Sequence, residues 1–337
     1  MNHFIESSIL KRHPANPLLT AADIPYRADL VFNAGVCHYQ GRYVMVFRND
    51  YGVTQQDYDD FYAGRRTNPP RFQTNIGLAF SQDGITWDVQ PKPCFSLEDN
   101  EILRAYDPRL TVLDGRVYMC FAVDTKHGLR GGVAVTDDFE KFEILSLSIP
   151  DNRNMVLFPR KVGGRYLRLE RPFPVYSRGA DRFDLWLGAS PDLRYWGDYD
   201  LVLGVEDVPF ADDKIGPAAP PVWTPRGWLT TFHAVDRDDA NRGKNGWEKK
   251  WTKRYHAGIM LLDLENPTKI VGMSKQPLLT PSTPYEQVGF RNDVIFPGGM
   301  ILEDSGEVKI YYGGADTVEC LATAHVDDLL ALCTQPR

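Results

Sequence analysis

The sequence predicts an all-β fold, a five-bladed β-propeller, because two kinds of short segment alternate along the chain. Five copies of each kind occur within the 337 residues. Aromatic residues make up 12% of the chain, and 28 Gly and 24 Pro are spread through it, as is typical of short strands separated by turns. One pair of segments takes about 65 residues, the length of a four-stranded propeller blade.

The first kind of segment is a glycine turn followed by an apolar strand. YQGR followed by YVMVFR is its first copy, and LDGR followed by VYMCFAVD is its second. The five copies lie at 39–48, 113–124, 162–172, 225–236 and 304–316. A glycine turn between two apolar strands predicts a β-hairpin, so each copy predicts one hairpin of a blade.

The second kind follows the pattern Gly/Ala-x-Ala-x-Ser/Thr-x-Asp and often ends on an aromatic residue. Three clear copies are IGLAFSQDGITW, GGVAVTDDFEKF and LWLGASPDLRYW, and two weaker ones lie at 257–267 and 320–329. An irregular β-sandwich with similar hairpins is the alternative fold. We expect one propeller domain over 1–337, with the first 15 or so residues as a contact arm of a homo-oligomer.

Polar residues stand at corresponding points of the repeats. Ahead of the glycine turns, a polar residue interrupts an apolar or Gly/Pro-rich stretch at Asn33, Asp107, Arg153, Lys214 and Asp293. After the strands that follow the turns, a second set contains Arg48, Asp124, Arg171, His233 and Asp316. The innermost strands of a propeller surround a central funnel, so we expect these side chains to converge there.

The chemistry of this set favours an anion site beside a sugar site. One guanidinium group can donate two parallel hydrogen bonds to phosphate oxygens, and lysine adds a point charge. The sequence therefore predicts a site for a compact dianion at Arg153, Arg171, Lys214 and His233. Asp107 is a candidate proton donor, while Asn33, Arg48 and Asp316 suit sugar hydroxyl groups. Taken singly, an arginine in this set would suit a rim salt bridge, and His233 a hydrogen-bonded core histidine.

Composition and motifs exclude several other functions. The net charge of −7 and the pI near 5.6 offer no basic face for nucleic acid, and no apolar run approaches membrane-spanning length. Five cysteines without a CxxC pair are typical of a cytoplasmic protein. Neither a phosphate-binding GxxxxGK[ST] loop nor a GxSxG elbow occurs, and the seven histidines are scattered. We therefore expect no metal and no cofactor.

The motifs resemble those of glycoside hydrolase family 130, the inverting β-mannoside phosphorylases with a five-bladed propeller. They extend from residue 16 to residue 316 and include VFNAG, VFRND, YDPRL, LFPRK, DKIGPAAPPV and YHAG. The resemblance implies that Asp107 is the general acid, acting directly or through the mannosyl 3-hydroxyl. It implies phosphate binding by Arg153, Arg171, Lys214 and His233. It implies contacts to the mannosyl unit by Asn33, Arg48, Tyr255 and Asp316.

By the same resemblance, the reaction is phosphorolysis of 4-O-β-D-mannosyl-D-glucose to α-D-mannose 1-phosphate and glucose, with phosphate as co-substrate. Mannooligosaccharides and mannosyl-N-acetylglucosamine are alternative substrates, and we expect loops 49–75 and 236–254 to border the acceptor. A β-mannosidase would need a second carboxylate, either Asp293 or Asp316. A non-catalytic carbohydrate-binding propeller is the third possibility. A general acid must still carry its proton near pH 7, so we expect the pKa of Asp107 to be raised.

Overall fold

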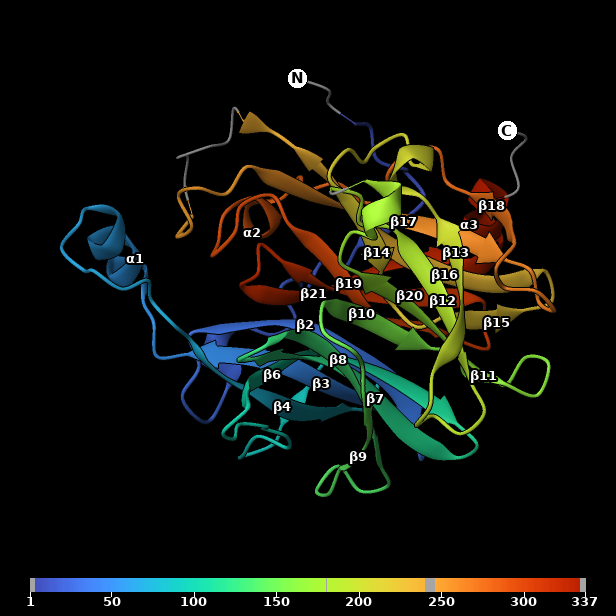
Figure 1. Ribbon diagram of the computed structural model, residues 1–337, viewed down its shortest axis with the longest axis horizontal. Coiled ribbons are helices and arrows are strands. Elements are labelled where there is room, and N and C mark those ends of the chain that lie inside the picture. Colours follow the sequence, from blue (N-terminus) through green and yellow to red (C-terminus); the bar gives the residue numbers. More distant parts are fainter. Residues whose placement is uncertain (1–3, 180, 240–245, 334–337) are drawn as a thin grey trace.

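Five antiparallel sheets form the five blades of a β-propeller in the computed structural model, which describes residues 4–179, 181–239 and 246–333 (Figure 1). β2 contacts both β6 and β19, and β10 contacts both β6 and β14. The first strand of each blade therefore lies innermost. This arrangement confirms the predicted propeller and excludes the sandwich.

Each of the first three blades runs in chain order from its innermost strand to its outermost strand. The first contains β2 (Leu30–Tyr39), β3 (Arg42–Tyr51), β4 (Gln73–Ser81) and β5 (Asp88–Val89). The second contains β6 (Ile102–Leu113), β7 (Arg116–Thr125), β8 (Gly128–Thr136) and β9 (Glu143–Leu147). The third contains β10 (Asn152–Leu157), β11 (Tyr166–Pro172), β12 (Leu185–Ser190) and β13 (Gly197–Leu203).

The last two blades depart slightly from this pattern. The fourth contains β14 (Lys214–Pro217), β16 (Gly227–Arg237), β17 (Lys253–Leu262) and β18 (Ile270–Met273), with β15 (Val222–Thr224) also paired to β16. The fifth contains β19 (Ile295–Leu302), β20 (Glu307–Gly314), β21 (Val318–His325) and β1 (Lys11–Arg12). Short 3₁₀ turns lie at Ala21–Asp23, Tyr176–Arg178 and Val205–Asp207.

The two repeated segments correspond to defined strands of each blade. The glycine turns precede the second strands, and Gly41 and Gly115 adopt φ of 76° and 77° there. The Gly/Ala-x-Ala segments form the third strands. Small residues fit these strands because the ring of Phe47 lies across Gly77, where a Cβ would approach it to 2.1 Å. The predicted repeat is therefore the structural repeat.

The N-terminal segment closes the ring within its own chain. Lys11 and Arg12 pair with Thr323 and Ala322, so β1 is the outermost strand of the fifth blade. The Arg12 guanidinium donates to both carboxylate oxygens of the fully buried Glu286, at 2.7 and 3.1 Å. The predicted oligomer contact of this segment stays a prediction.

The core lies between blades, so each sheet is covered on both faces. β3 accordingly has eight consecutive buried residues rather than an alternating pattern. Of the helices, α3 (Val326–Cys333) packs Leu329 and Leu330 into the core beside β17, and α2 (Pro284–Gln287) is one short turn. α1 (Gln55–Tyr62), absent from the sequence prediction, projects from the ring at the left of Figure 1.

Candidate active site

Bulges in the innermost strands direct polar side chains toward the centre. In β2 the register jumps from Phe32 to Gly35, and in β6 it jumps from Tyr106 to Arg109. Asn33 and Asp107 fall within these jumps and have φ of 54° and 53°. Asn and Asp tolerate the left-handed region better than other side chains, which explains these residue types at the bulges.

The bulge register refines the predicted equivalence of the repeats. In the third blade, Asn154 occupies the left-handed position with φ of 56°, while Arg153 precedes it and pairs with Arg171. Lys214 lies in a strand with regular pairing, opposite Val235. The predicted residues therefore gather at the funnel from corresponding strands, but Arg153 and Lys214 are not the positional counterparts of Asp107.

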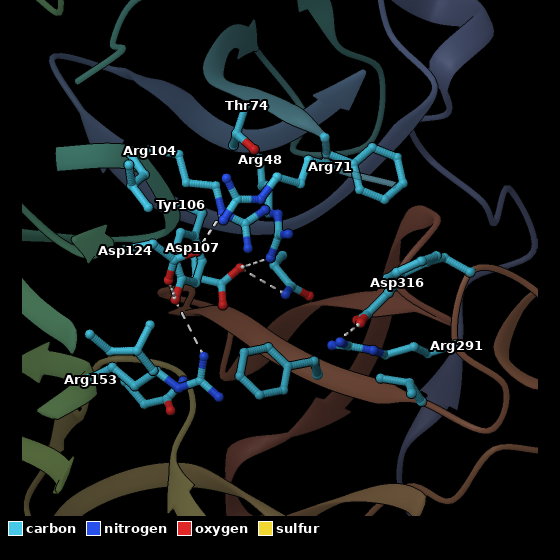
Figure 2. A pocket seen from close by; sticks show the side chains of 18 of the residues that line it. Arg48, Arg71, Thr74, Arg104, Tyr106, Asp107, Asp124, Arg153, Arg291 and Asp316 are labelled. Atoms are coloured by element: carbon cyan, nitrogen blue, oxygen red, sulfur yellow. Dashed lines mark hydrogen bonds and ion pairs between the residues drawn. The ribbon is translucent and has the colours of Figure 1, made fainter. Parts of the chain in front are cut away.

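A cavity of about 520 Å³ opens over these bulges, and eight of the nine predicted site residues line it (Figure 2). They are Asn33, Arg48, Asp107, Arg153, Arg171, His233, Tyr255 and Asp316. Lys214 is not among the lining residues, and neither is Asp293. The structure therefore brings eight of the nine predicted residues together in one cavity and places Lys214 and Asp293 outside its lining.

The Asp107 carboxylate is held by two neighbours from the first blade. Its Oδ1 accepts hydrogen bonds from Asn33 Nδ2 at 3.0 Å and from Arg48 Nη1 at 3.2 Å. Burial by itself would raise the pKa of Asp107, but the positive charges of Arg48 and Arg109 and the Asn33 hydrogen bond hold it below its usual value. The predicted raised pKa is therefore wrong for the unliganded protein.

An unneutralised cationic group lies beside Asp107. Arg153 and Arg171 are directly opposite each other on β10 and β11, and burial together with Arg153 lowers the pKa of Arg171 to about 9. Burial and the neighbouring cations also hold the pKa of His233 well below its usual value. Within the described part of the chain, Arg153 Nε, Arg171 Nε and His233 Nδ1 are buried without hydrogen-bond partners. Such atoms are costly unless a ligand satisfies them.

Lys214 lies behind this group, outside the cavity wall. Its Nζ lies 3.5 Å from Asp213, and the Lys214 and Arg171 charges stand 5.2 and 5.1 Å from the centre of the Phe183 ring. Burial, followed by the charges of Arg171 and Lys253, lowers the pKa of Lys214 to about 6. The side chain therefore belongs to the cationic group electrostatically, although it does not face the cavity with the others.

A row of stacked planar groups leads from the cationic group to the other end of the cavity. Tyr255 stacks between His233, at 6.0 Å, and Trp251, at 5.7 Å. The Arg291 guanidinium lies 4.6 Å from the Trp251 ring centre and donates to Asp316 at 3.2 Å. Burial raises the pKa of Asp316 even though Arg291 and Arg48 act in the opposite direction.

Asp124, also in the predicted set, lines the cavity through a polar chain on the second blade. It accepts hydrogen bonds from Tyr106 Oη at 2.8 Å and from Arg104 Nε at 2.6 Å. The same Tyr106 hydroxyl accepts from Arg153 at 3.4 Å. Asp124 therefore positions one of the cations instead of pairing with it directly.

The sequence prediction that loops 49–75 and 236–254 border the acceptor named no residue of the cavity mouth. The loop 49–75 contributes Tyr58, Arg71 and Phe72 to the cavity lining. Phe290 and Arg291 line the cavity beside them. Phe72 stacks on Trp247 at 6.3 Å, so the two long loops meet at one rim. The aromatic residues within otherwise polar loops were the available signal for this wall.

Across residues 4–179, 181–239 and 246–333, no three His, Cys, Asp or Glu side chains are grouped as metal ligands would be. In the same residues, no helix is long and apolar enough to cross a membrane.

The propeller funnel places the Asp107 carboxyl group beside buried guanidinium and imidazole nitrogens that lack hydrogen-bond partners, an arrangement that suits a glycoside phosphorylase, the class of enzyme that transfers a glycosyl group to phosphate. A family model described as β-1,4-mannooligosaccharide phosphorylase matches residues 9–335. The chain belongs to this family, glycoside hydrolase family 130.

Three known proteins place the chain within the family. It is 32% identical to a β-1,4-mannooligosaccharide phosphorylase from Ruminococcus albus, over 96% of this chain and 90% of that protein. It is 26% identical to a 4-O-β-D-mannosyl-D-glucose phosphorylase from Bacteroides fragilis, over 94% and 83%. The solved β-1,2-mannobiose phosphorylase of Listeria innocua, in complex with β-1,2-mannobiose, superposes with a TM-score of 0.80 at 25% identity, over 99% of both chains.

Proposed function

We propose that the chain catalyses inverting phosphorolysis of a β-1,4-mannosidic bond, releasing α-D-mannose 1-phosphate. The observation that carries the proposal is a set of buried nitrogens without hydrogen-bond partners, on Arg153, Arg171 and His233, whose side chains line one cavity with the Asp107 carboxyl group. Two guanidinium groups without a hydrogen-bonded acidic partner favour an anion, and a phosphate group offers them several acceptor oxygens, with the His233 imidazole beside them.

The β-1,4 linkage is supported by the description of the family model and by the relative with 32% identity. Two acceptors remain candidates for the leaving sugar. The identity of 32% against 26% favours mannose at the end of a mannooligosaccharide, whereas the resemblance of individual motifs favours the glucose of 4-O-β-D-mannosyl-D-glucose. We propose the mannooligosaccharide as the preferred substrate and mannosyl-glucose as the second candidate.

In the proposed reaction, a phosphate oxygen held by the cationic group attacks C1 of the mannosyl unit from the face opposite the leaving sugar. The bond from C1 to the glycosidic oxygen breaks, and Asp107 supplies the proton to that oxygen directly or through the mannosyl 3-hydroxyl. Because phosphate is already an anion, no second carboxylate is required to activate it. Its negative charge also offsets the arginines that lower the pKa of Asp107, which favours the protonated acid in the complex.

Hydrolysis is the competing reaction, and the geometry gives it less support. Asp293 lies outside the cavity lining, so it is poorly placed to activate water there. Asp316 lies inside the cavity but is paired with Arg291 at 3.2 Å. The cationic group would have no role in attack by water.

The experiment is the release of mannose 1-phosphate from β-1,4-mannobiose and from 4-O-β-D-mannosyl-D-glucose, each with and without inorganic phosphate. β-1,2-Mannobiose serves as the linkage control. Strictly phosphate-dependent release from a β-1,4 disaccharide supports the proposal, and the ratio of kcat/KM values assigns the acceptor. Free mannose formed without phosphate would identify a hydrolase instead. A homo-oligomeric assembly and a cytoplasmic location stay predictions of the sequence.

A further inference from the structure

One charged residue of the YDPRL segment takes no part in the proposed chemistry. Arg109, in β6, is 3% exposed and does not line the cavity. Its guanidinium donates to the backbone carbonyls of Pro108 and Ala218 at 2.8 Å, and to those of Asn33 and Pro297 at 3.4 Å. These four carbonyls belong to four different blades, so a single side chain ties the innermost strands together.

Burying the Arg109 charge costs free energy of folding, which a side chain that only filled space would not require. Every hydrogen-bond partner of Arg109 among the described residues is a backbone carbonyl. Burial lowers its pKa, although Asp107 and Glu319 act in the opposite direction. Burying a charge without a hydrogen-bonded counter-ion costs stability, and an apolar residue of similar volume is often as stable or more so, so packing alone does not explain Arg109.

Glu319 holds the same peptide group from its other end. This carboxyl group lies on β21, is fully buried, and accepts a hydrogen bond from the backbone N–H of Ala34 at 3.0 Å. The carbonyl of Asn33 and the N–H of Ala34 belong to one peptide unit. Arg109 therefore binds the oxygen of this unit while Glu319 binds its nitrogen, which fixes the orientation of the peptide plane.

The fixed peptide follows directly on the residue that contacts the general acid. Asn33 has a left-handed backbone, and its side chain donates to Asp107. The surroundings leave little freedom, because a Cβ on Gly298 would approach the Ala34 carbonyl to 2.0 Å. Arg109 also binds the Pro108 carbonyl, so both bulges that bring Asn33 and Asp107 together are tied to the same guanidinium.

We infer that Arg109 and Glu319 are a pair of positioning residues that fix the Asn33–Ala34 peptide and thereby hold Asn33 against the Asp107 carboxyl group. The inference rests on the proposed role of Asp107. It extends the site to two residues that touch neither sugar nor phosphate, and it gives the arginine of YDPRL a role in the reaction.

The test uses substitutions at both ends of the peptide. Arg109→Lys keeps the charge but cannot reach four carbonyls, and Glu319→Met removes the acceptor at similar volume. We expect each to lower kcat 10- to 100-fold while KM for phosphate stays within threefold of the wild type. Glu319→Gln keeps an acceptor oxygen for Ala34 and should stay within threefold in kcat. Rates are expressed per binding-competent site, counted by titration with α-D-mannose 1-phosphate.

Arg168→Lys is the matched control, since Arg168 is equally buried but donates to Glu170 at 2.7 Å, away from the cavity. We expect its kcat within twofold of the wild type. Equal kcat per site in Arg109→Lys, Glu319→Met and the wild type would overturn the inference and leave the pair a structural role only. If Arg109→Lys does not fold, the Glu319→Met and Glu319→Gln comparison decides the matter alone.

A crystal structure of Glu319→Met tests the geometry without reference to any substrate. We expect a rotated Asn33–Ala34 peptide and loss of the contact between Asn33 and Asp107. An unchanged peptide with that contact retained would contradict the inference even if the wild type showed no phosphorolysis. Absence of wild-type activity alone would contradict only the proposed function.

Discussion

Asn33 donates a hydrogen bond of 3.0 Å to Asp107, although 74 positions separate the two residues in the chain. The contact joins a bulge in the first blade to the corresponding bulge in the second. Propeller symmetry therefore does more than bring polar residues to one funnel, because the same local distortion, repeated in adjacent blades, places one side chain in hydrogen-bonding range of the next.

The first prediction concerns the carboxyl group of Asp107. Asp107→Asn should lower kcat for a β-1,4-mannoside by about 10²–10⁴-fold, because an amide cannot supply the proton to the leaving sugar. Binding of α-D-mannose 1-phosphate should stay measurable by calorimetry. Asp137→Asn, which alters an exposed pair with Arg116, is the control and should leave kcat unchanged. Wild-type turnover in Asp107→Asn would reject the assignment of the acid.

The second prediction concerns the stability cost of the anion site. Arg171 is 2% exposed, and its Nε is buried without a hydrogen-bond partner among the described residues. Arg171→Met should raise KM for phosphate by about 10- to 100-fold, since a charge-assisted hydrogen bond contributes about 1.5–3 kcal/mol. The same change removes a buried, unneutralised charge, so Tm measured without phosphate should not fall.

Differential scanning fluorimetry with and without phosphate checks this pair of expectations. The wild type should gain more in Tm from added phosphate than Arg171→Met does. A large loss of Tm in phosphate-free buffer would instead mean that Arg171 stabilises the fold, and the site would then need another anion ligand.

The sequence predicted the blades and most of the site for one physical reason. Each blade packs against its two neighbouring blades in the same way. Glycine turns and strands of small residues therefore recur in every blade, and they can be recognised in the sequence as a repeat. The placement of Lys214 could not be predicted, because its surroundings include Phe183, which comes from a distant part of the chain and pairs with Lys214.

The direction in which the pKa of Asp107 shifts could not be predicted from the sequence for a related reason. It depends on charges brought from other strands, Arg48 among them. The contacts of Arg109 could not be predicted either, because its four partners are backbone carbonyls, which every residue has whatever its side chain. Contacts between blades decide all of these features, and a repeat along one chain does not encode them.

The third prediction concerns proton uptake when phosphate binds. The pKa of Lys214 is lowered to about 6, so at pH 7.5 its amine is mostly neutral in the unliganded protein. A phosphate anion beside Arg171 raises that pKa, and the amine then takes up a proton. Calorimetric titrations in two buffers of different ionisation enthalpy should show net uptake at pH 7.5. Lys214→Met should reduce the uptake, and equal uptake in both proteins would assign the proton elsewhere.

The fourth prediction concerns closure of the ring by β1. Arg12→Met leaves the fully buried Glu286 without its cation, and breaking such a pair costs about 3–5 kcal/mol. Tyr312 still donates to Glu286 at 2.8 Å, so the loss should lie at the lower end of this range. Urea unfolding measures the difference, with kcat per folded molecule unchanged. A loss below about 1 kcal/mol would mean that β1 contributes little to closure.

The last prediction concerns Arg291, which joins Asp316, a proposed mannosyl-binding residue, to Glu248. It donates to Asp316 at 3.2 Å and to Glu248 at 2.7 Å, and its charge acts against the burial that raises the pKa of Asp316. Arg291→Met should therefore raise that pKa further, so the Asp316 carboxylate becomes protonated at a higher pH than in the wild type.

A protonated Asp316 accepts hydrogen bonds from sugar hydroxyls less well than the carboxylate does. KM for the mannoside in Arg291→Met should accordingly rise about tenfold, and it should rise more at pH 5.5 than at pH 8. KM for phosphate should be unaffected, because Arg291 lies at the far end of the stack from His233. If KM rose equally for the mannoside and for phosphate, and did so at both pH values, Arg291 would instead support the whole cavity through Glu248 and Trp251.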